Sequence, residues 1–386
     1  MSEDNWQILF VDDEPDVCTQ IDEGLNGEVI GDPERTLRVK TCTDFNKALE
    51  ILETHRFDLI ILDVRLGDHS VVDVEDEAGI QALDAIKQRR FMPVIFYTNL
   101  PKHVQHLETP DVALIRVVEK TDGIPALMDM INQVISTSIP DINRALIRHV
   151  ESVQRDYMWT FLPKHWDLIK SISDRTTLAY LLSRRLAISL PGPNITKFSC
   201  ELGESSPKGH AKAGKFIHPM LFYIMPPVIE KPLAGDIYSE KIDGRTEFWV
   251  LLTPSCDIVQ EKAEFALMAH CNLLTEQNEF LEWKESNSNN KRKILEDLIK
   301  NNRKTGQSER YHFLPGALDI PDLIVDFQKT RIIEPRILAD NTGTLKRRAS
   351  LDSPFAEALV ARFSRYFGRL GTPDLDLELI LGRLRT

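Results

Sequence analysis

Short apolar runs alternate with amphipathic segments over the first 140 residues. Strands are predicted over residues 7–11, 37–41, 58–63, 93–98 and 113–118. Helices are predicted over residues 16–25, 45–55, 79–90 and 124–136. Asp44 is placed to cap the second of these helices. The strand at 58–63 (DLIILD) is apolar almost throughout, which is typical of a strand covered on both faces. The alternation predicts an α/β doubly wound (βα)5 domain with a parallel sheet.

The pattern changes after Pro140 and predicts an α+β C-terminal region. Residues 141–190 carry aromatic and leucine side chains at helical spacing. From residue 216 to 274, short apolar strands are separated by Pro and Gly, which predicts a small antiparallel sheet or barrel. A polar, basic helix is expected within 284–310 and a further strand or two within 321–338. An amphipathic helix over 353–370, capped by Asp352 or Ser353, closes the chain.

Composition and cysteine usage are those of a globular protein in a reducing compartment. Hydrophobic residues make up 42% of the chain and charged residues 27%. We find no apolar run of 18 residues, so no membrane span is expected, and the acidic start of the chain does not read as a signal peptide. The five cysteines form no CxxC pair, which favours the cytoplasm over a disulfide framework.

Charge is distributed unevenly along the chain. Residues 1–139 contain 27 acidic and 12 basic residues, a net charge of −15, whereas the remainder has a net charge of +3. The break supports a domain boundary near Pro140. We therefore expect a domain at 1–138, a helical connector or dimerisation segment at 139–190, and an α+β domain at 191–386. The acidic first domain argues against binding to nucleic acid, because phosphate would repel it.

Polar side chains follow the predicted strands of the first domain at the points where the strands end. They are Asp12, Asp13, Asp63, Thr98 and Lys120. The carboxyl ends of parallel strands meet at one edge of the sheet, so these side chains should converge. Three gathered carboxylates repel one another and need a cation. Mg²⁺ suits them because it prefers hard oxygen ligands in octahedral geometry. A carboxylate can also act as a nucleophile and form an aspartyl-phosphate.

With these five residues in this order, residues 6–137 resemble the receiver domain of two-component response regulators. The resemblance implies that Asp63 accepts a phosphoryl group from a histidine kinase or phosphotransfer protein in a phosphorelay. Asp12, Asp13 and Asp63, with the backbone carbonyl of Arg65, would then hold Mg²⁺. Thr98 and Lys120 would bind the phosphoryl oxygens.

Several positions depart from the family pattern. Gly79, where the third helix is expected to start, lies 16 residues after Asp63, and the loop between them is long and acidic over 70–77. Asn99 and Thr121 replace a smaller residue and a proline, and Val117 stands where an aromatic residue often switches, although Tyr97 could substitute for it. These departures leave open a second hypothesis, in which the protein is a phosphate sink or buffer for a partner kinase. A stress or phage-defence circuit would be a suitable setting.

The C-terminal two-thirds carry no helix-turn-helix, P-loop or nucleophile-elbow motif. We therefore expect output through contact with a protein effector, and a homodimer through the helix at 141–170 is a further possibility. A third hypothesis makes this region a hydrolase-like or nuclease-like enzyme gated by the receiver. In it, Cys256 is the nucleophile and His270 or His312 the base. Zinc binding by Cys256, His270 and Cys271 lacks the usual spacing, and a buried, inert Cys256 is the simpler interpretation.

Overall fold

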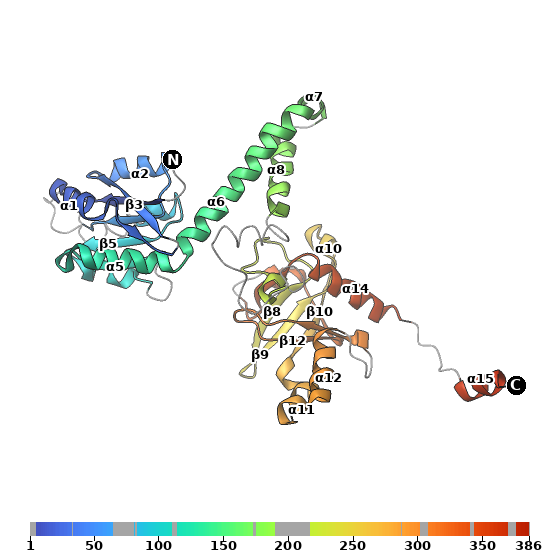
Figure 1. Ribbon diagram of the computed structural model, residues 1–386. Helices are drawn as coiled ribbons and strands as arrows, with labels where there is room; N and C mark the ends of the chain where they lie inside the picture. Colours follow the sequence, from blue (N-terminus) through green and yellow to red (C-terminus); the bar gives the residue numbers. More distant parts are fainter. Residues whose placement is uncertain are drawn as a thin grey trace. The chain divides into compact units, whose positions relative to one another are not determined.

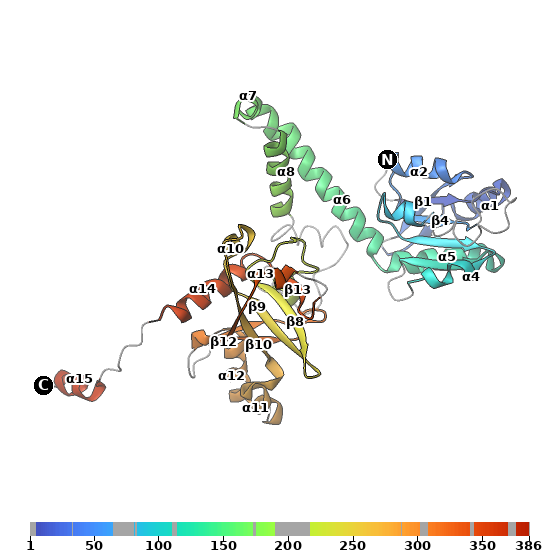
Figure 2. The ribbon, with the colours of Figure 1, turned by 180° about the vertical axis from the view of Figure 1, so that it is seen from behind.

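The computed structural model describes most of the chain and divides it into two compact units, residues 1–214 and 215–386 (Figures 1 and 2). Each unit is treated by itself below. The described residues are 5–32, 34–64, 81, 83–109, 114–172, 175–189, 217–286, 288–301, 308–339, 343–369 and 376–385.

The first unit contains a six-stranded sheet with the order β2-β3-β1-β4-β5-β6. Five of its strands run parallel, and β2 is an antiparallel edge. The strands are β1 (Asn5–Val11), β2 (Val29–Ile30), β3 (Arg35–Cys42), β4 (Leu59–Leu62), β5 (Val94–Thr98) and β6 (Ile115–Glu119). The predicted doubly wound α/β fold is confirmed, and each parallel strand lies where its apolar run predicts it.

Helices cover both faces of this sheet. They are α1 (Pro15–Leu25), α2 (Phe45–Thr54), α4 (Pro101–Val104) and α5 (Gly123–Ser136). Side chains of α1 and α5 join one buried cluster with alternate residues of β1 and β3, and side chains of α2 and α4 join a second cluster on the other face. Asp44 caps α2 as predicted, because its carboxylate accepts a hydrogen bond from the Lys47 amide at 2.8 Å. The helix predicted over 79–90 lies partly outside the described residues.

A helical segment follows α5 without a strand between them. It comprises α6 (Ile139–Asp156), a π-helical turn (Tyr157–Phe161), α7 (Leu162–Ile172) and α8 (Arg175–Ser189). The predicted helical texture after residue 140 is therefore confirmed. Figure 1 shows α6 leading into α7, with α8 folded back beside α6.

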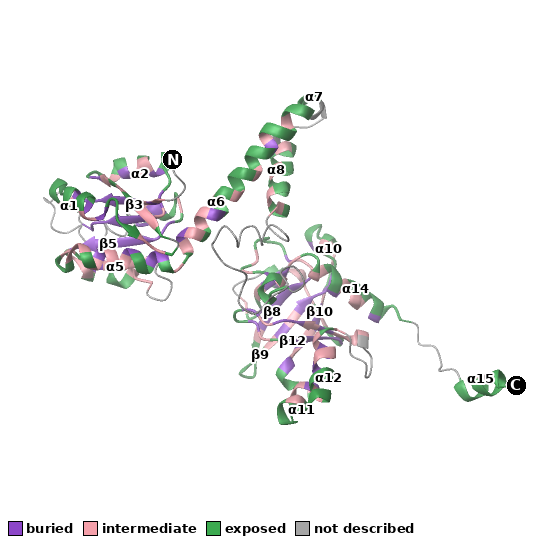
Figure 3. Cartoon of the chain, viewed as in Figure 1, coloured by how far each residue is buried: buried purple, intermediate pink, exposed green. Residues whose placement is uncertain are grey.

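The second unit is built on a curled sheet with the order β11-β12-β10-β9-β8-β13-β7, in which all neighbours are antiparallel. Figure 3 shows buried residues along its central strands. The strands are β7 (Tyr223–Ile224), β8 (Asp236–Ile242), β9 (Arg245–Leu251), β10 (Ala266–Leu273), β11 (Tyr311–Leu314), β12 (Leu323–Ile333) and β13 (Lys346–Leu351). The predicted antiparallel sheet is confirmed.

The helices of the second unit are interspersed with its strands along the chain. They are α10 (Ser255–Val259), α11 (Asn278–Ser286), α12 (Asn289–Ile299), α13 (Pro335–Ala339), α14 (Phe355–Phe367) and α15 (Leu377–Leu384). The capping prediction for α14 is wrong. Pro354 occupies the cap position, and the Asp352 carboxylate accepts from the adjacent Ser353 amide instead. None of the helices in the described ranges is both long and apolar enough to cross a membrane.

Candidate functional site

The parallel register of the first sheet brings three acidic side chains to its carboxyl edge. Val11 at the end of β1 pairs with Leu62 at the end of β4, so the residues that follow them emerge side by side. Carboxylate oxygens of Asp12, Asp13 and Asp63 all lie within 4.8 Å of one another. Asp12 and Asp63 are buried, and Asp13 is half-buried.

Lys120 supplies the positive charge of this cluster. Its Nζ lies 2.8 Å from Asp12 Oδ2 and 2.8 Å from Asp63 Oδ2. Burial alone would lower the pKa of Lys120, but attraction by Asp12 and Asp63 outweighs it and raises the pKa, so the side chain stays protonated. The ammonium thus bridges two of the three carboxylates in this part of the described structure.

The Asp12 and Asp63 carboxylates are also held by backbone amides. Asp12 Oδ1 accepts from the Glu14 amide at 3.0 Å, and Asp63 Oδ1 accepts from the Val64 amide at 2.6 Å. Burial raises the pKa of Asp12, although the bonds from Lys120 and Glu14 oppose that rise. The carboxylates are therefore fixed in position before any ligand arrives, as a preorganised binding site requires.

The hydroxyl group of Thr98 completes the same edge of the sheet. Thr98 is the last residue of β5, which pairs in parallel with β4, and its side chain is fully buried. Its Oγ1 accepts a hydrogen bond from the Leu100 amide at 3.1 Å. The predicted Arg65 carbonyl lies outside the described residues, so the site is built here from the other five.

Tyr97 connects this site to the turn that precedes α5. Its ring is buried and makes an edge contact with Phe10 at 6.3 Å. Its hydroxyl donates to the Lys120 carbonyl at 3.4 Å. Lys120 opens a single 3₁₀ turn that leads directly into α5. The sequence pattern does not predict this contact, because the contact depends on how the Tyr97 side chain is oriented in the fold.

The Cys256 site of the third hypothesis does not assemble among the described residues, and the simpler interpretation of a buried Cys256 is also wrong. Cys256 is exposed at the start of α10, with its Sγ 3.5 Å from Asp257 Oδ1. His270 Nε2 pairs instead with Glu247 Oε2 at 2.6 Å, and His312 is buried in β11. A cavity of about 1080 Å³ is lined by His270 and Cys271, but Cys256 is not among its described lining residues. The reason lies in the strand pairing. His270 in β10 pairs with Trp249 in β9, whereas Cys256 lies in α10.

Comparison with known proteins concerns the first third of the chain. The family model for the response regulator receiver domain matches residues 8–132. No curated protein matches the chain.

Solved structures of receiver domains are similar at low sequence identity. Response regulator TrrA of Thermotoga maritima, solved with Mg²⁺ and BeF, is 20% identical, with 33% of this chain and 98% of that chain covered at a TM-score of 0.25. Chemotaxis protein CheY4 of Vibrio cholerae is 21% identical over the same shares, also at 0.25. The signal receiver domain of an HD domain-containing protein of Pseudomonas fluorescens is 18% identical, covering 34% of this chain and 95% of that chain at 0.26.

The assignment rests on the family model together with the side chains at the carboxyl edge of the sheet. Residues 8–132 of this protein are therefore a response regulator receiver domain, and the rest of the chain is assigned to no family.

Proposed function

We propose that this protein is a response regulator that accepts a phosphoryl group on Asp63 and acts through its helical and C-terminal parts by contact with a protein effector. The observation that carries the proposal is the position of Asp63. It is a buried carboxylate at the carboxyl end of β4, with Asp12, Asp13 and Lys120 around it. The donor is a phosphohistidine on a kinase or phosphotransfer protein.

In the transfer step, one oxygen of the Asp63 carboxylate forms a bond to phosphorus while the bond between phosphorus and the donor histidine nitrogen breaks. The nitrogen keeps the electron pair and takes a proton from solvent. The transferred group carries charge on three oxygens, so its neighbours must supply donors and cations. Lys120 Nζ and Thr98 Oγ1 are the protein groups for that role, and Lys120 must leave its present contact with Asp63 to fill it.

The three carboxylates also fit a divalent cation. Asp12, Asp13 and Asp63 offer hard oxygen atoms within 4.8 Å of one another, and Lys120 pairs with Asp12 and Asp63. Mg²⁺ bound by these residues, with the Arg65 carbonyl as a further ligand, would neutralise charge on the phosphoryl oxygens. Acidic residues and Lys120 position the reacting groups, and buried backbone amides hold the acidic residues in place.

Output would start at Lys120. Movement of this ammonium toward a phosphoryl oxygen pulls on the 3₁₀ turn that begins α5, and the Tyr97 hydroxyl is bonded to the carbonyl of the same residue. Because α5 continues into α6, a shift of α5 reaches the helical segment. The alternative, a phosphate sink, requires the same chemistry at Asp63 without this shift.

The test is phosphorylation of the full chain by acetyl phosphate, followed by intact-mass spectrometry. We expect one added phosphate that depends on Mg²⁺ and is lost in Asp63→Asn. Asp68→Asn, an acidic position outside the proposed ligand set, is the control and should keep the modification. An unmodified wild-type protein, or modification retained in Asp63→Asn, would contradict the proposal.

Hydrogen exchange distinguishes a regulator from a sink. With beryllofluoride as the phosphoryl mimic, a regulator should change exchange in α5 and α6 and also beyond residue 215. A change confined to the residues around Asp63 would favour the sink and rule out transmitted output.

A further inference from the structure

The helical segment after the receiver contains a helix with no charged residue on most of its surface. The sequence of α8, RTTLAYLLSRRLAIS, has charges only at Arg175, Arg184 and Arg185. Most surface helices of globular proteins combine one apolar stripe with a charged opposite face, whereas α8 mixes leucine, alanine, tyrosine and isoleucine with uncharged threonine and serine. In contrast, α6 carries charged residues throughout its length.

One side of α8 is accounted for by α6. Leu178, Leu182 and Leu186 recur every fourth residue and are half-buried. At the end of the helix, Ser189 Oγ lies 2.8 Å from His149 Nε2. Arg185 pairs with Asp156 at 2.6 Å. These contacts fix the two helices as an antiparallel hairpin, visible in Figure 1.

The remaining described residues of α8 are exposed. Its exposed uncharged residues are Thr176, Thr177, Ala179, Tyr180, Leu181, Ser183, Ala187 and Ile188. Tyr180 is 66% exposed, Leu181 43% and Ile188 60%. Among the described side chains of α7 and α8, none is buried. Helices of this length are marginal in water without packing, so exposed helices such as these gain stability when a further surface packs against them.

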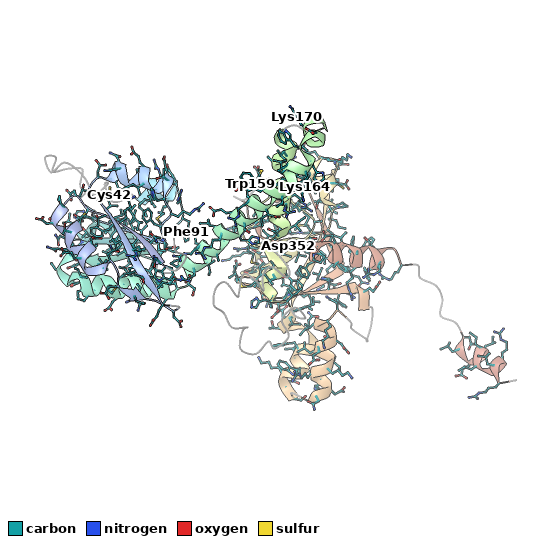
Figure 4. All side chains as sticks on the ribbon, turned by 45° about the horizontal axis from the view of Figure 1, so that its top comes forward. Cys42, Phe91, Trp159, Lys164, Lys170 and Asp352 are labelled. Carbon is teal, nitrogen blue, oxygen red and sulfur yellow. The ribbon has the colours of Figure 1, made fainter. Side chains whose placement is uncertain are left out.

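The neighbouring helix adds an apolar stripe of its own. Ile142, Leu146 and Val150 on α6 recur every fourth residue and are 44%, 41% and 36% exposed. Figure 4 shows Trp159, which is 77% exposed and lies in the π-helical turn that follows α6. Two helices that both expose apolar residues provide half of the core-facing surfaces of a four-helix bundle.

We infer that this hairpin, α6 with α8, is the interface of a homodimer, in which two copies form a four-helix bundle. The inference is independent of phosphorylation at Asp63 and would stand without it. A second copy supplies a face of the same chemistry, as a twofold interface requires. On α8 this face carries one charge, Arg184, which lies one turn from both Tyr180 and Ile188.

The available area reaches the lower end of what a specific dimer needs. Ile142, Leu146, Val150, Tyr180, Leu181 and Ile188 together expose roughly 230–430 Å² of apolar side chain per copy, at about 60–120 Å² for a whole aliphatic side chain and about 150–250 Å² for tyrosine. Interfaces between identical subunits are about two-thirds apolar. Two copies would then bury roughly 700–1,300 Å², and the upper part of this range reaches the lower limit of specific complexes at about 1,200 Å².

The experiment is sedimentation velocity on the full chain without phosphodonor, from about 1 to 50 μM. We expect the mass to approach twice the monomer mass of 44.1 kDa. The double variant Leu181→Glu, Ile188→Glu should remain monomeric across the range. Val228→Glu places the same charge at an apolar residue that is 81% exposed in the other unit, and it should still dimerise.

Cross-linking keeps the test decisive if the double variant loses its helices, which far-UV circular dichroism would show. With Cys200 and Cys256 replaced by serine, Tyr180→Cys should form a disulfide-linked dimer under mild oxidation, and Val228→Cys should not. A wild-type chain that stays monomeric at 50 μM would overturn the inference. So would a dimer that survives in the folded double variant, because its interface would then lie elsewhere.

Discussion

At the scale of single residues, burial of an ionisable side chain changes its pKa and therefore the pH range in which the protein loses stability. His312 in β11 is 8% exposed, and burial, together with the nearby Arg362 charge, lowers its pKa to about 4. The side chain is therefore neutral at pH 7. In the unfolded chain the same imidazole has a pKa of about 6.5.

The depressed pKa of His312 predicts loss of stability in acid. Between pH 6.5 and 4 the unfolded state binds a proton that the folded state does not, so the free energy of unfolding decreases as the pH falls through that window. For this one group the loss between pH 7 and 4.5 should be about 2–3 kcal/mol. Urea unfolding at the two pH values should show a smaller loss in His312→Gln. An equal loss in both proteins would contradict the prediction.

The receiver residues were predictable from sequence one by one, but their partners were not. Asp12, Asp13, Asp63, Thr98 and Lys120 each directly follow or end a strand, and parallel pairing then fixes where they meet. That Lys120 contacts both Asp12 and Asp63 depends on side-chain rotamers in the fold, which no spacing encodes. Cys256 shows the converse case. A strand followed by Pro-Ser-Cys-Asp resembles a site in sequence, yet in the described part of the chain Cys256 pairs with Asp257 and His270 pairs with Glu247.

At the scale of elements, a joint holds α6 against the receiver at the amino-terminal end of its sheet. Two guanidinium groups lie over the ring of Trp6 in β1, that of Arg35 at 4.5 Å and that of Arg144 at 4.8 Å from its centroid. Arg144 Nε pairs with Asp58 Oδ1 at 3.0 Å, and Arg35 pairs with Asp141 at 2.5 Å. The side chains of Arg144 and Asp58 are only 14% and 12% exposed.

This joint predicts unequal effects for two arginines. Arg144→Met leaves the Asp58 carboxylate without its cation in a nearly buried place, and should lower the free energy of unfolding by about 2–4 kcal/mol. Arg56 pairs with Glu151 of the same helix at 2.7 Å, but both side chains are half exposed. Arg56→Ala should therefore cost less than about 1 kcal/mol. Urea unfolding measures both, and a similar effect of the two variants would show that the joint contributes little.

Elements with long apolar runs were the easiest to predict. The five parallel strands and most helices follow from their patterns, because burial on both faces leaves little room for polar residues. The strand β2 has only two residues and is partly exposed, so it leaves no such pattern. The joint itself could not be predicted, since Trp6, Asp58 and Arg144 lie far apart in the chain and meet only through the sheet.

At the scale of the whole molecule, the charge break near Pro140 and the packing of α6 mark different boundaries. The prediction of a domain at 1–138 rests on charge. In the fold, Pro140 and Ala145 are buried, and Arg144 contacts Asp58 and the Asn5 carbonyl. The first turns of α6 thus complete the receiver, although they carry the basic residues that start the second charge region.

Fragments test where the folding unit ends. A fragment of residues 1–156 should be more stable than one of residues 1–138 by about 2–4 kcal/mol, because the shorter one lacks the partner of Asp58 and the burial of Ala145. Urea unfolding of the two fragments gives the difference. Equal stability would show that the receiver ends before α6, as the charge pattern alone suggests.

The helical segment runs without a break from residue 139 to 172, so a small rotation at the Trp6 joint moves its far end over a larger distance. At 1.5 Å per residue this segment is roughly 50 Å long. A tilt of only about 5° at the joint would carry its far end by about 4 Å, comparable to the rise of a helical turn. A side-chain displacement at Lys120 too small to alter the sheet could in this way become a movement large enough to change which surfaces meet at the far end of the segment.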